Sequence, residues 1–207
     1  MRFLKQPRMQ AWLNHPTLFN AWRGLLDGNR AEMRRLLREV LDLQPGEWLL
    51  DVCCGTGDYA AIANSQYVGL DLNPNFIAFA RRRYAGSNGK TFIVADATLD
   101  NFTPKSFDKA LFINALHHFP DDLALRILRQ VSRLTKSRVV IVDLMPDPGH
   151  PLRRILVPLD RGDYVRPLEE KTALIAQVFD IEQQHIYSAR VAKEVMYVCR
   201  PRGADSK

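Results

Sequence analysis

The sequence predicts one α/β domain, with a seven-stranded and mostly parallel sheet, helices on both faces and a helical extension at the N-terminus. Short apolar, β-branched runs alternate with segments of helical periodicity, which is typical of parallel strands joined by crossover helices. The 207 residues suffice for a single domain with a full core. A glycine turn also follows the first of the strand-like runs, which is where sheets of this kind bind ligands.

Two helices are expected in the N-terminal extension, residues 1–44, which we interpret either as a cap over a pocket or as a plain packing element. Trp12 lies ahead of the first helix, and Asn29 can cap the second one. Pro45 and Gly46 are expected to end the second helix. The apolar positions at helical spacing are Phe19, Trp22, Leu25 and Leu26 in the first helix, and Met33, Leu36, Leu37, Val40 and Leu41 in the second.

The remainder, residues 45–200, is expected to form the sheet and its helices as one domain, with 201–207 as a flexible tail. A helix is expected to begin at Asn73 and Pro74, because Asn caps helices and Pro suits the first turn. Further helices are expected at about 57–64, after Pro120 and at 168–178, and strands at 48–53, 67–72, 91–96, 107–115, 138–144, 179–187 and 194–200.

Composition is that of an ordinary globular protein, with 46% hydrophobic and 25% charged residues. No apolar run reaches the roughly 18 residues needed to cross a bilayer, and the first residues lack the apolar core of a signal peptide, so we expect a cytoplasmic protein. The net charge of +6 permits peripheral contact with an anionic membrane or a nucleic acid, but the basic clusters are short and scattered. Cys53 and Cys54 fit no disulfide or CxxC pattern, so we interpret them as small buried thiols and expect no metal site.

The glycine turn "GTGDYA", residues 55–60, satisfies the dinucleotide fingerprint G-x-G-x-x-A, but the carboxylates around it favour another nucleotide ligand. A dinucleotide places its pyrophosphate at the N-terminus of the first helix, where Asp58 would repel it. S-adenosylmethionine has no phosphate and carries a sulfonium and an ammonium, which suit Asp51 beside the turn. Asp71, at the end of the second strand, can accept hydrogen bonds from both ribose hydroxyls.

The stretch "LLDVCCGTGDYAAIANSQYVGLDLNPNFIAFAR", followed by "VADA" and "FDKALFINALHHFPD", resembles the class I S-adenosylmethionine-dependent methyltransferases, which have a Rossmann-like fold. The resemblance covers roughly residues 45–145. That family's usual first motif is an acid followed by G-x-G-x-G, and here Cys53 stands at the first glycine. The turn "DVCCGTGD" is similar to that of the ubiquinone and menaquinone biosynthesis methyltransferases.

This resemblance implies S-adenosylmethionine as cofactor, with S-adenosylhomocysteine as product, and gives a role to each of ten residues. Asp51, Cys53, Gly55 and Gly57 are placed beneath the methionine part, Asp71 on the ribose, Leu72, Asp96 and Ala97 on the adenine, and Asn114 and Ala115 at the methionyl group and the methyl. From the residues alone, Asp96 can also be explained as the cap of the next turn, and Asp51 as a strand-end acid that holds loop amides.

Methyl transfer from a sulfonium is an in-line displacement that positioning and desolvation accelerate, so a general base is needed only where the nucleophile must lose a proton. The candidates for a catalytic role are His117, Asp143 and Tyr164. The segment 144–167 interrupts the alternation of strands and helices and is expected to form part of an acceptor lid. The residues assigned to the acceptor are His118, Tyr164, Arg166 and Trp22.

We expect the acceptor to be a small or lipid-like molecule rather than RNA. Enzymes that methylate base amino groups commonly carry an Asn/Asp-Pro-Pro-aromatic motif after the fourth strand, where this chain has "NALHHF". Cytosine C5 enzymes need a nucleophilic cysteine in the same region, and this stretch contains none. No RNA-binding module is evident in the sequence. An RNA methyltransferase, or a domain that binds S-adenosylmethionine without catalysis and acts as a scaffold, stays open as an alternative.

Overall fold

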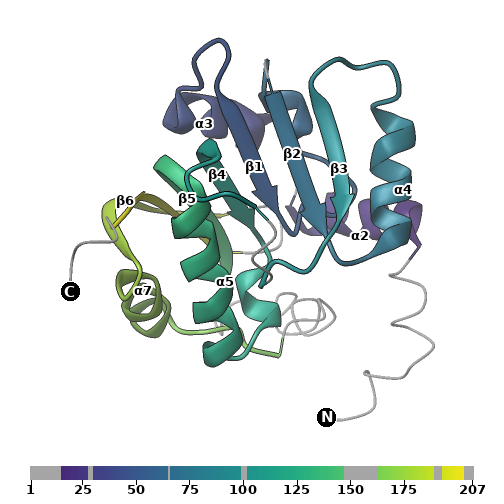
Figure 1. Cartoon of the computed structure of the whole chain (residues 1–207). Coiled ribbons are helices and arrows are strands. Elements are labelled where there is room, and N and C mark those ends of the chain that lie inside the picture. The colour runs from purple at the N-terminus through teal and green to yellow at the C-terminus, as the bar shows by residue number, and fades with distance from the viewer. Residues whose placement is uncertain are drawn as a thin grey trace.

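A computed structural model of the chain describes residues 15–27, 30–64, 66–98, 102–146, 163–188 and 193–202. These residues form the predicted seven-stranded sheet, with strand order β3-β2-β1-β4-β5-β7-β6 (Figure 1). The strands are β1 (Trp48–Val52), β2 (Gln66–Asp71), β3 (Lys90–Val94), β4 (Phe107–Ile113), β5 (Thr135–Met145), β6 (Phe179–Ser188) and β7 (Lys193–Pro201). Strands β1 to β5 are parallel, and β7 is antiparallel to both β5 and β6.

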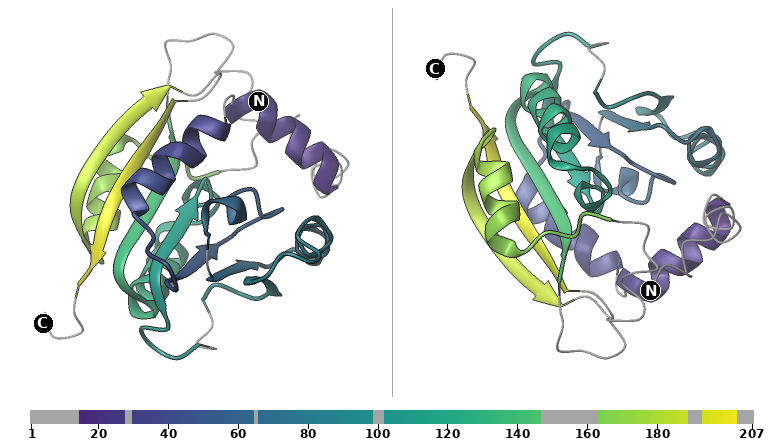
Figure 2. Two further views of the ribbon diagram at one scale, coloured as in Figure 1. Left: turned by 90° about the horizontal axis from the view of Figure 1, so that it is seen from above. Right: turned by 90° about the horizontal axis from the view of Figure 1, so that it is seen from below.

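Helices cover both faces of the sheet, as predicted (Figure 2). Helices α5 (Asp121–Leu134) and α7 (Leu168–Ala176) bury their apolar residues in one cluster with one face of the strands. Helices α3 (Arg30–Leu41) and α4 (Pro74–Arg83) bury theirs in a second cluster with the other face. The first described helix, α2 (Pro16–Asp27), packs against α4 near the carboxyl edge of the sheet.

Two helix boundaries follow from local residues. Helix α4 begins as predicted, because the Asn73 side chain accepts a hydrogen bond from the Asn75 amide at 3.0 Å and Pro74 stands in the first turn. Helix α3 ends at Leu41, before the proline and glycine that were expected to end it. Asp42 is already left-handed there, with φ of 47°, and this conformation stops a right-handed helix.

The segment after β1 differs from the prediction. In place of a helix over 57–64, the chain forms a single 3₁₀ turn, η1 (Ala60–Ile62). Gly57 has φ of 76°, which interrupts a right-handed helix, and its carbonyl accepts the i→i+3 hydrogen bond of the Ala60 amide at 3.2 Å.

The strand order reverses between β1 and β4. The chain runs outward from β1 through β2 to β3 and then returns to place β4 on the other side of β1. In open α/β sheets this reversal opens a ligand crevice at the carboxyl ends of the two strands. The predicted binding turn therefore lies at the position that the topology favours. No helix in the described ranges is long and apolar enough to cross a bilayer.

Candidate active site

The glycine turn joins β1 to η1 and is built from left-handed residues. Cys53, Gly55 and Gly57 have φ values of 58°, 55° and 76°, a region that glycine enters without strain. A Cβ on Gly57 would lie 2.8 Å from the Phe92 ring, so a larger residue does not fit there without a shift of that ring. Burial raises the pKa of the Cys53 and Cys54 thiols well above their usual range, which keeps both protonated near neutral pH.

Asp71 holds this turn from the end of β2. Its Oδ2 accepts a hydrogen bond from the Gly55 amide and its Oδ1 accepts one from the Asn73 amide, both at 2.8 Å. Each carboxylate oxygen has two lone pairs, so the half-buried group keeps acceptor capacity for a ligand. The next residue, Leu72, is 69% exposed and leaves an apolar side chain open to solvent. The ribose and adenine roles of these two residues stay predictions.

Asp51 lies at the carboxyl end of β1 and is almost completely buried, with 1% of its surface exposed. Its Oδ2 accepts a hydrogen bond from the Tyr67 hydroxyl at 2.7 Å. Burial raises the pKa of Asp51 to about 7; the Tyr67 hydroxyl opposes this rise, and the nearby Asp71 and Asp58 charges add to it. A carboxyl group with this pKa is poised to ionise when a cation arrives.

A cavity of about 70 Å³ lies at the carboxyl ends of β1 and β4, against the turn. Six of its lining residues are Phe19, Arg23, Asp51, Thr56, Asn114 and His118. Pockets that hold a whole small ligand measure roughly 300–1,000 Å³, so this cavity encloses only part of a nucleotide. A cavity of about 270 Å³, lined by residues that include Arg38, Gln44 and Asn64, lies toward the amino ends of β1 and β2, away from the turn.

Helix α2 lies over the turn. The Thr56 hydroxyl donates to Asn20 Oδ1 at 2.6 Å, and the Phe19 ring packs on Phe76 with 4.7 Å between ring centroids. A Cβ on Gly55 would lie 3.6 Å from the Phe19 ring, so this ring lies directly over the turn. Trp12 and the side chain of Trp22 lie outside the described part of the structure.

Asp58 forms an ion pair with an arginine of the protein. Its Oδ1 accepts a hydrogen bond from Arg83 at 2.6 Å, and the Arg34 guanidinium reaches its backbone carbonyl at 3.5 Å. The sequence argument held that Asp58 repels a phosphate and suits a cationic tail. Its pairing with Arg83 weakens both effects, so the preference for a cationic ligand is carried by Asp51.

Asp96 takes the capping position that the sequence left open. Its Oδ1 accepts hydrogen bonds from the amide and the hydroxyl of Thr98, both at 2.8 Å. These two bonds lower the pKa of the Asp96 carboxyl below its usual range, so it is ionised at neutral pH. Its predicted contact with adenine, and that of the neighbouring Ala97, stay predictions.

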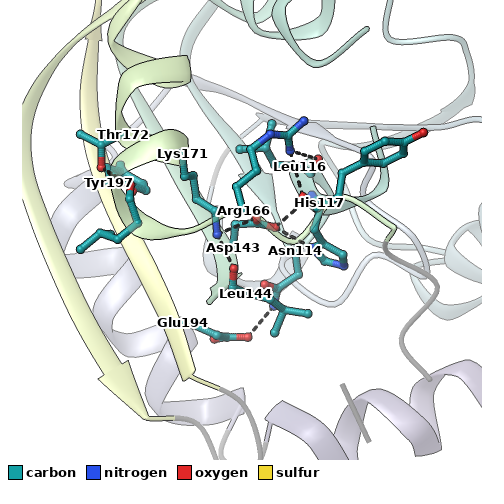
Figure 3. Close-up of polar contacts among 12 residues, drawn as sticks. Asn114, Leu116, His117, Asp143, Leu144, Arg166, Lys171, Thr172, Glu194 and Tyr197 are labelled. Carbon is teal, nitrogen blue, oxygen red and sulfur yellow. Dashed lines mark hydrogen bonds and ion pairs between the residues drawn. The ribbon is translucent and has the colours of Figure 1, made fainter. Parts of the chain in front are cut away.

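His117 and Asp143, two of the predicted catalytic residues, lie in a buried ion-pair cluster that does not support a direct catalytic role. His117 Nδ1 lies 2.6 Å from Asp143 Oδ1, and Lys171 Nζ lies 2.9 Å from Asp143 Oδ2. Lys171 also donates to the Leu144 carbonyl. Figure 3 shows these polar contacts. The side chains of His117, Asp143 and Lys171 are 0% exposed, and none of the three lines the cavity.

The charge state of Asp143 agrees with a structural role. Burial alone would raise the pKa of this carboxyl, but the charges and hydrogen bonds of His117 and Lys171 outweigh burial and lower the pKa to about 2. Asp143 is therefore ionised near neutral pH, and a group with such a pKa takes up no proton in that range. The three residues join the short helix η2 (Leu116–His118) after β4, the end of β5 and α7.

The guanidinium donors of Arg166, a residue predicted to bind the acceptor, are used within the protein. Its guanidinium donates twice to Asp121 Oδ1, at 2.6 and 2.8 Å, and once each to the carbonyls of Leu116, Phe119 and Tyr164. These contacts use its five N–H donors. Arg166 therefore fixes the η2 (Leu116–His118) region to the start of α5. Tyr164 is 43% exposed and stays a candidate for the acceptor site. Residues 147–162, most of the predicted lid, lie outside the described ranges.

Asn114 and His118 follow β4 and line the cavity, whereas Ala115 does not. Asn114 is left-handed, with φ of 50°, and its amide donates to the Val142 carbonyl at 2.7 Å. Ala115 is 4% exposed and packs in the apolar cluster beneath α5, a position that does not support its predicted place at the methyl. Asn114 thus faces the cavity, whereas the next residue, Ala115, packs in the apolar cluster.

Five lining residues were not assigned to the site by sequence reasoning. These are Arg23, Cys54, Thr56, Tyr59 and Ile113. Arg23 lies four residues after Phe19 on α2, so helical spacing from an aromatic residue over the turn is the signal that would have found it. Within the described residues, no group of three or more His, Cys, Asp and Glu side chains is arranged to hold a metal ion.

Comparison with known proteins identifies the central part of the chain. Residues 49–138 match the family model described as "Methyltransferase domain". This match contains the glycine turn, Asp71 and the end of β4.

Curated relatives match at moderate identity. The chain is 33% identical over 172 residues to an O-methyltransferase of Pyrenophora dematioidea, covering 73% of this chain and 64% of that protein. It is 31% identical over 135 residues to the phosphoethanolamine N-methyltransferase of Triticum aestivum, covering 62% of this chain and 26% of that protein. The chain thus spans less than two thirds of the length of either relative.

Solved structures share the fold. The magnesium protoporphyrin IX methyltransferase of Synechocystis PCC 6803, crystallised with bound SAH, superposes with a TM-score of 0.69 at 18% identity. The superposition covers 94% of this chain and 99% of that one.

Proposed function

We propose that the chain is a class I S-adenosylmethionine-dependent methyltransferase and that it transfers a methyl group from this donor to a small or lipid-like acceptor. One observation carries the proposal: among the described residues, the buried Asp51 contacts a tyrosine hydroxyl and no cationic side chain. A buried carboxylate without a positive partner is unfavourable. The ammonium of the donor's methionine tail would supply that partner.

The proposed donor crosses the carboxyl ends of three neighbouring strands. Its adenine would lie between Leu72 and Asp96, its ribose hydroxyls on Asp71, and its methionine tail on Asp51. These groups belong to the ends of β2, β3 and β1, which are adjacent in the sheet. Strands lie about 4.8 Å apart, so this series suits an extended nucleoside with an amino-acid tail. Only the tail would enter the enclosed cavity, and the adenosine would extend over the exposed Leu72.

The cavity offers a charge to each end of the zwitterionic tail. Asp51 would accept from the ammonium, and Arg23, which is 8% exposed and lines the same cavity, would bind the carboxylate. Arg23 belongs to α2, which also brings Phe19 over the turn. The helix would therefore close over the donor and keep water from the methionine part.

When bound, S-adenosylmethionine supplies an activated methyl group on a sulfonium. The residues of this chain then need to bind, align and exclude water, and a base is required only for an acceptor that must lose a proton. His118 lines the cavity and Tyr164 is exposed near the same loop, because its amide donates to the His117 carbonyl at 3.0 Å. These two residues are candidates for contact with the acceptor, and the same role for Trp22 stays a prediction.

A small acceptor is supported by the names of the relatives, which include a phosphoethanolamine N-methyltransferase and an O-methyltransferase. The charge of the acceptor is not set by Arg166, since its donors are used within the protein. RNA-stimulated methyl incorporation from S-adenosylmethionine would replace this choice of acceptor by the RNA alternative.

Isothermal titration calorimetry with S-adenosylmethionine, S-adenosylhomocysteine and NADH tests the proposal. We expect micromolar binding of the first two. Asp71→Ala should weaken donor binding at least tenfold, because it removes the ribose acceptor and the hydrogen bond that holds the Gly55 amide. Asp180→Ala, on the exposed edge strand β6, is the matched control and should leave the affinity for both sulfur compounds unchanged. Binding of NADH in place of both sulfur compounds would contradict the proposal, and unchanged affinity in Asp71→Ala would remove that residue from the site.

A further inference from the structure

We propose that Glu194, near the start of β7, is a positioning residue that fixes the Asn114 amide with its Oδ1 toward the methyl-bearing sulfonium of the donor. Tyr187, on β6, orients Glu194 in turn. The inference rests on the proposed function. It concerns residues 187 and 194, which lie outside the range 49–138 that matches the family model.

A chain of hydrogen bonds links the three residues. Asn114 Nδ2 donates to Glu194 Oε1 at 2.8 Å (Figure 3), and the Tyr187 hydroxyl donates to Glu194 Oε2 at 2.7 Å. Glu194 is 1% exposed and Asn114 is 8% exposed, so both lie in the interior. Strands β6 and β7 pair Tyr187 directly with Glu194, which makes the arrangement part of the hairpin rather than of a loop.

The carboxylate decides which way the Asn114 amide points. An ionised carboxylate only accepts hydrogen bonds, and an Asn side chain has one donor end and one acceptor end. The NH₂ group must therefore face Glu194, and Oδ1 faces the other way. The backbone is fixed as well, because the left-handed Asn114 donates its amide to the Val142 carbonyl.

Asn114 Oδ1 is buried and has no hydrogen-bond donor among the residues that the structure describes. Asn114 also lines the cavity at the turn. Buried polar atoms in native proteins are nearly always satisfied, so an exception at a cavity indicates a ligand atom. The structure thus holds a rigid acceptor oxygen at a place where a ligand is proposed to bind.

The order of the strands assigns this oxygen to the methyl end of the donor. Adenine, ribose and methionine tail are proposed for the ends of β3, β2 and β1, and β4 is the next strand in the sheet. Asn114 follows β4 directly, three residues beyond Leu111, which pairs with Asp51 in the sheet, and both Asp51 and Asn114 line the cavity. On this side of the tail lie the sulfur and the group that leaves it.

A carbonyl oxygen at this point distinguishes the donor from its product. The sulfonium is positively charged and polarises its methyl hydrogens, which can form C–H···O contacts with Oδ1. S-adenosylhomocysteine is neutral at sulfur and has no methyl group. The negative charge of Glu194 on the Nδ2 side increases the polarity of the amide, which strengthens the attraction for the cation. Glu194 therefore favours binding of the donor over the product and aligns its methyl group.

The test compares the dissociation constants of S-adenosylmethionine and S-adenosylhomocysteine in Glu194→Gln by calorimetry. The glutamine side chain of this variant is uncharged and can present either end of its amide to Asn114, so the Oδ1 orientation is no longer enforced. We expect the Kd for S-adenosylmethionine to rise about three- to tenfold and that for S-adenosylhomocysteine to stay within about twofold. Glu182→Gln, an exposed residue on β6, is the matched control and should change neither constant.

Two further variants keep the proposal open to contradiction. Tyr187→Phe leaves the charge of Glu194 in place and should change the ratio of the two constants in the same direction by a smaller factor, and it serves if Glu194→Gln does not fold. Asn114→Ala combined with Glu194→Gln should lose no more than Asn114→Ala alone, since Glu194 acts through Asn114. The proposal is overturned if the variants weaken the binding of both ligands equally, or if the ratio of the two dissociation constants is unchanged in both single variants. Absence of binding of both ligands to the unaltered protein would instead contradict the proposed function.

Discussion

Two buried aspartates of the same sheet have opposite electrostatic surroundings. Asp51 in β1 and Asp143 in β5 are 1% and 0% exposed, and both lie toward the carboxyl ends of their strands. The pKa of Asp51 is raised to about 7, whereas that of Asp143 is lowered to about 2. Burial raises the pKa of both carboxyl groups, so the difference comes from their partners.

The partners of Asp143 belong to the protein, and those of Asp51 do not include a cation among the described residues. His117 and Lys171 are within ion-pair distance of Asp143. Among the described residues, Asp51 accepts a hydrogen bond from the neutral Tyr67 hydroxyl, and the acids Asp71 and Asp58 lie nearby. The two buried acids thus have different roles. Asp143 completes an ion-pair cluster within the protein, and Asp51 is proposed to bind the cation of a ligand.

The two groups also affect stability in opposite pH ranges. The folded-state pKa of Asp51 is raised above its usual value of 3.8, so its contribution to stability is complete below about pH 4 and is lost as pH rises through about 7. The pKa of Asp143 is lowered, so its contribution is present above about pH 4 and is lost as pH falls toward 2. Near neutral pH, Asp143 supports the fold while Asp51 weakens it.

The largest expected effect comes from removing a partner of Asp143. Lys171→Met should lower the free energy of unfolding by about 3–5 kcal/mol, because it leaves a buried carboxylate with His117 alone. Chemical denaturation measures this change. Lys136→Met, on the same strand β5, removes an exposed pair with Asp108 and should cost less than about 1 kcal/mol. Similar losses in the two variants would mean that the cluster behind the cavity is not a structural anchor.

The next largest effect separates binding from stability at Asp51. Asp51→Asn should weaken binding of S-adenosylmethionine about 10- to 100-fold, which corresponds to the loss of one hydrogen bond to a charged group. Its free energy of unfolding at pH 8 should stay equal or rise, since a buried charge is removed. Calorimetry and denaturation measure the two quantities, with Asp180→Asn on β6 as control. A variant that loses stability and keeps donor affinity would reverse the comparison of the two aspartates.

A smaller effect is expected at Tyr67, whose hydroxyl lowers the pKa of Asp51. Tyr67→Phe should raise that pKa further and weaken donor binding about three- to tenfold at pH 7, since one hydrogen bond contributes about 1 kcal/mol. The loss should shrink at pH 8, where Asp51 is more fully ionised in both proteins. Tyr197→Phe, whose hydroxyl contacts Thr172 instead, is the control. A loss independent of pH would assign Tyr67 a packing role only.

Sequence reasoning was accurate where the signal is local. The strand runs, the Asn73 cap and the glycine turn are each set by neighbouring residues, and the structure confirms their positions. The topology then follows, because parallel strands with crossover helices allow few arrangements. For the same reason, the sequence predicts that Asp71 and the glycine turn belong to one binding site, and the structure joins them by a hydrogen bond.

The predictions for three charged residues share one physical weakness. His117 and Asp143 are titratable groups near strand ends, which is the pattern of a catalytic site, and Arg166 is a charged residue in the segment before α7. Their partners, Lys171 and Asp121, are distant in sequence, and only the fold shows that these charges are used internally. Conversely, Glu194 meets Asn114 across 80 positions, a contact that no local pattern contains.

Proton release on ligand binding is the most direct test of the proposal that Asp51 awaits the cation of the donor. Calorimetry with S-adenosylmethionine at pH 6, in two buffers of different ionisation enthalpy, measures the number of protons released. Asp51 is mostly protonated at this pH, while an α-amino group, with a pKa of about 7.7–8.0, is already charged. We expect release of nearly one proton per donor bound by the unaltered protein and none by Asp51→Asn. No release by the unaltered protein, or equal release by both proteins, would contradict the account.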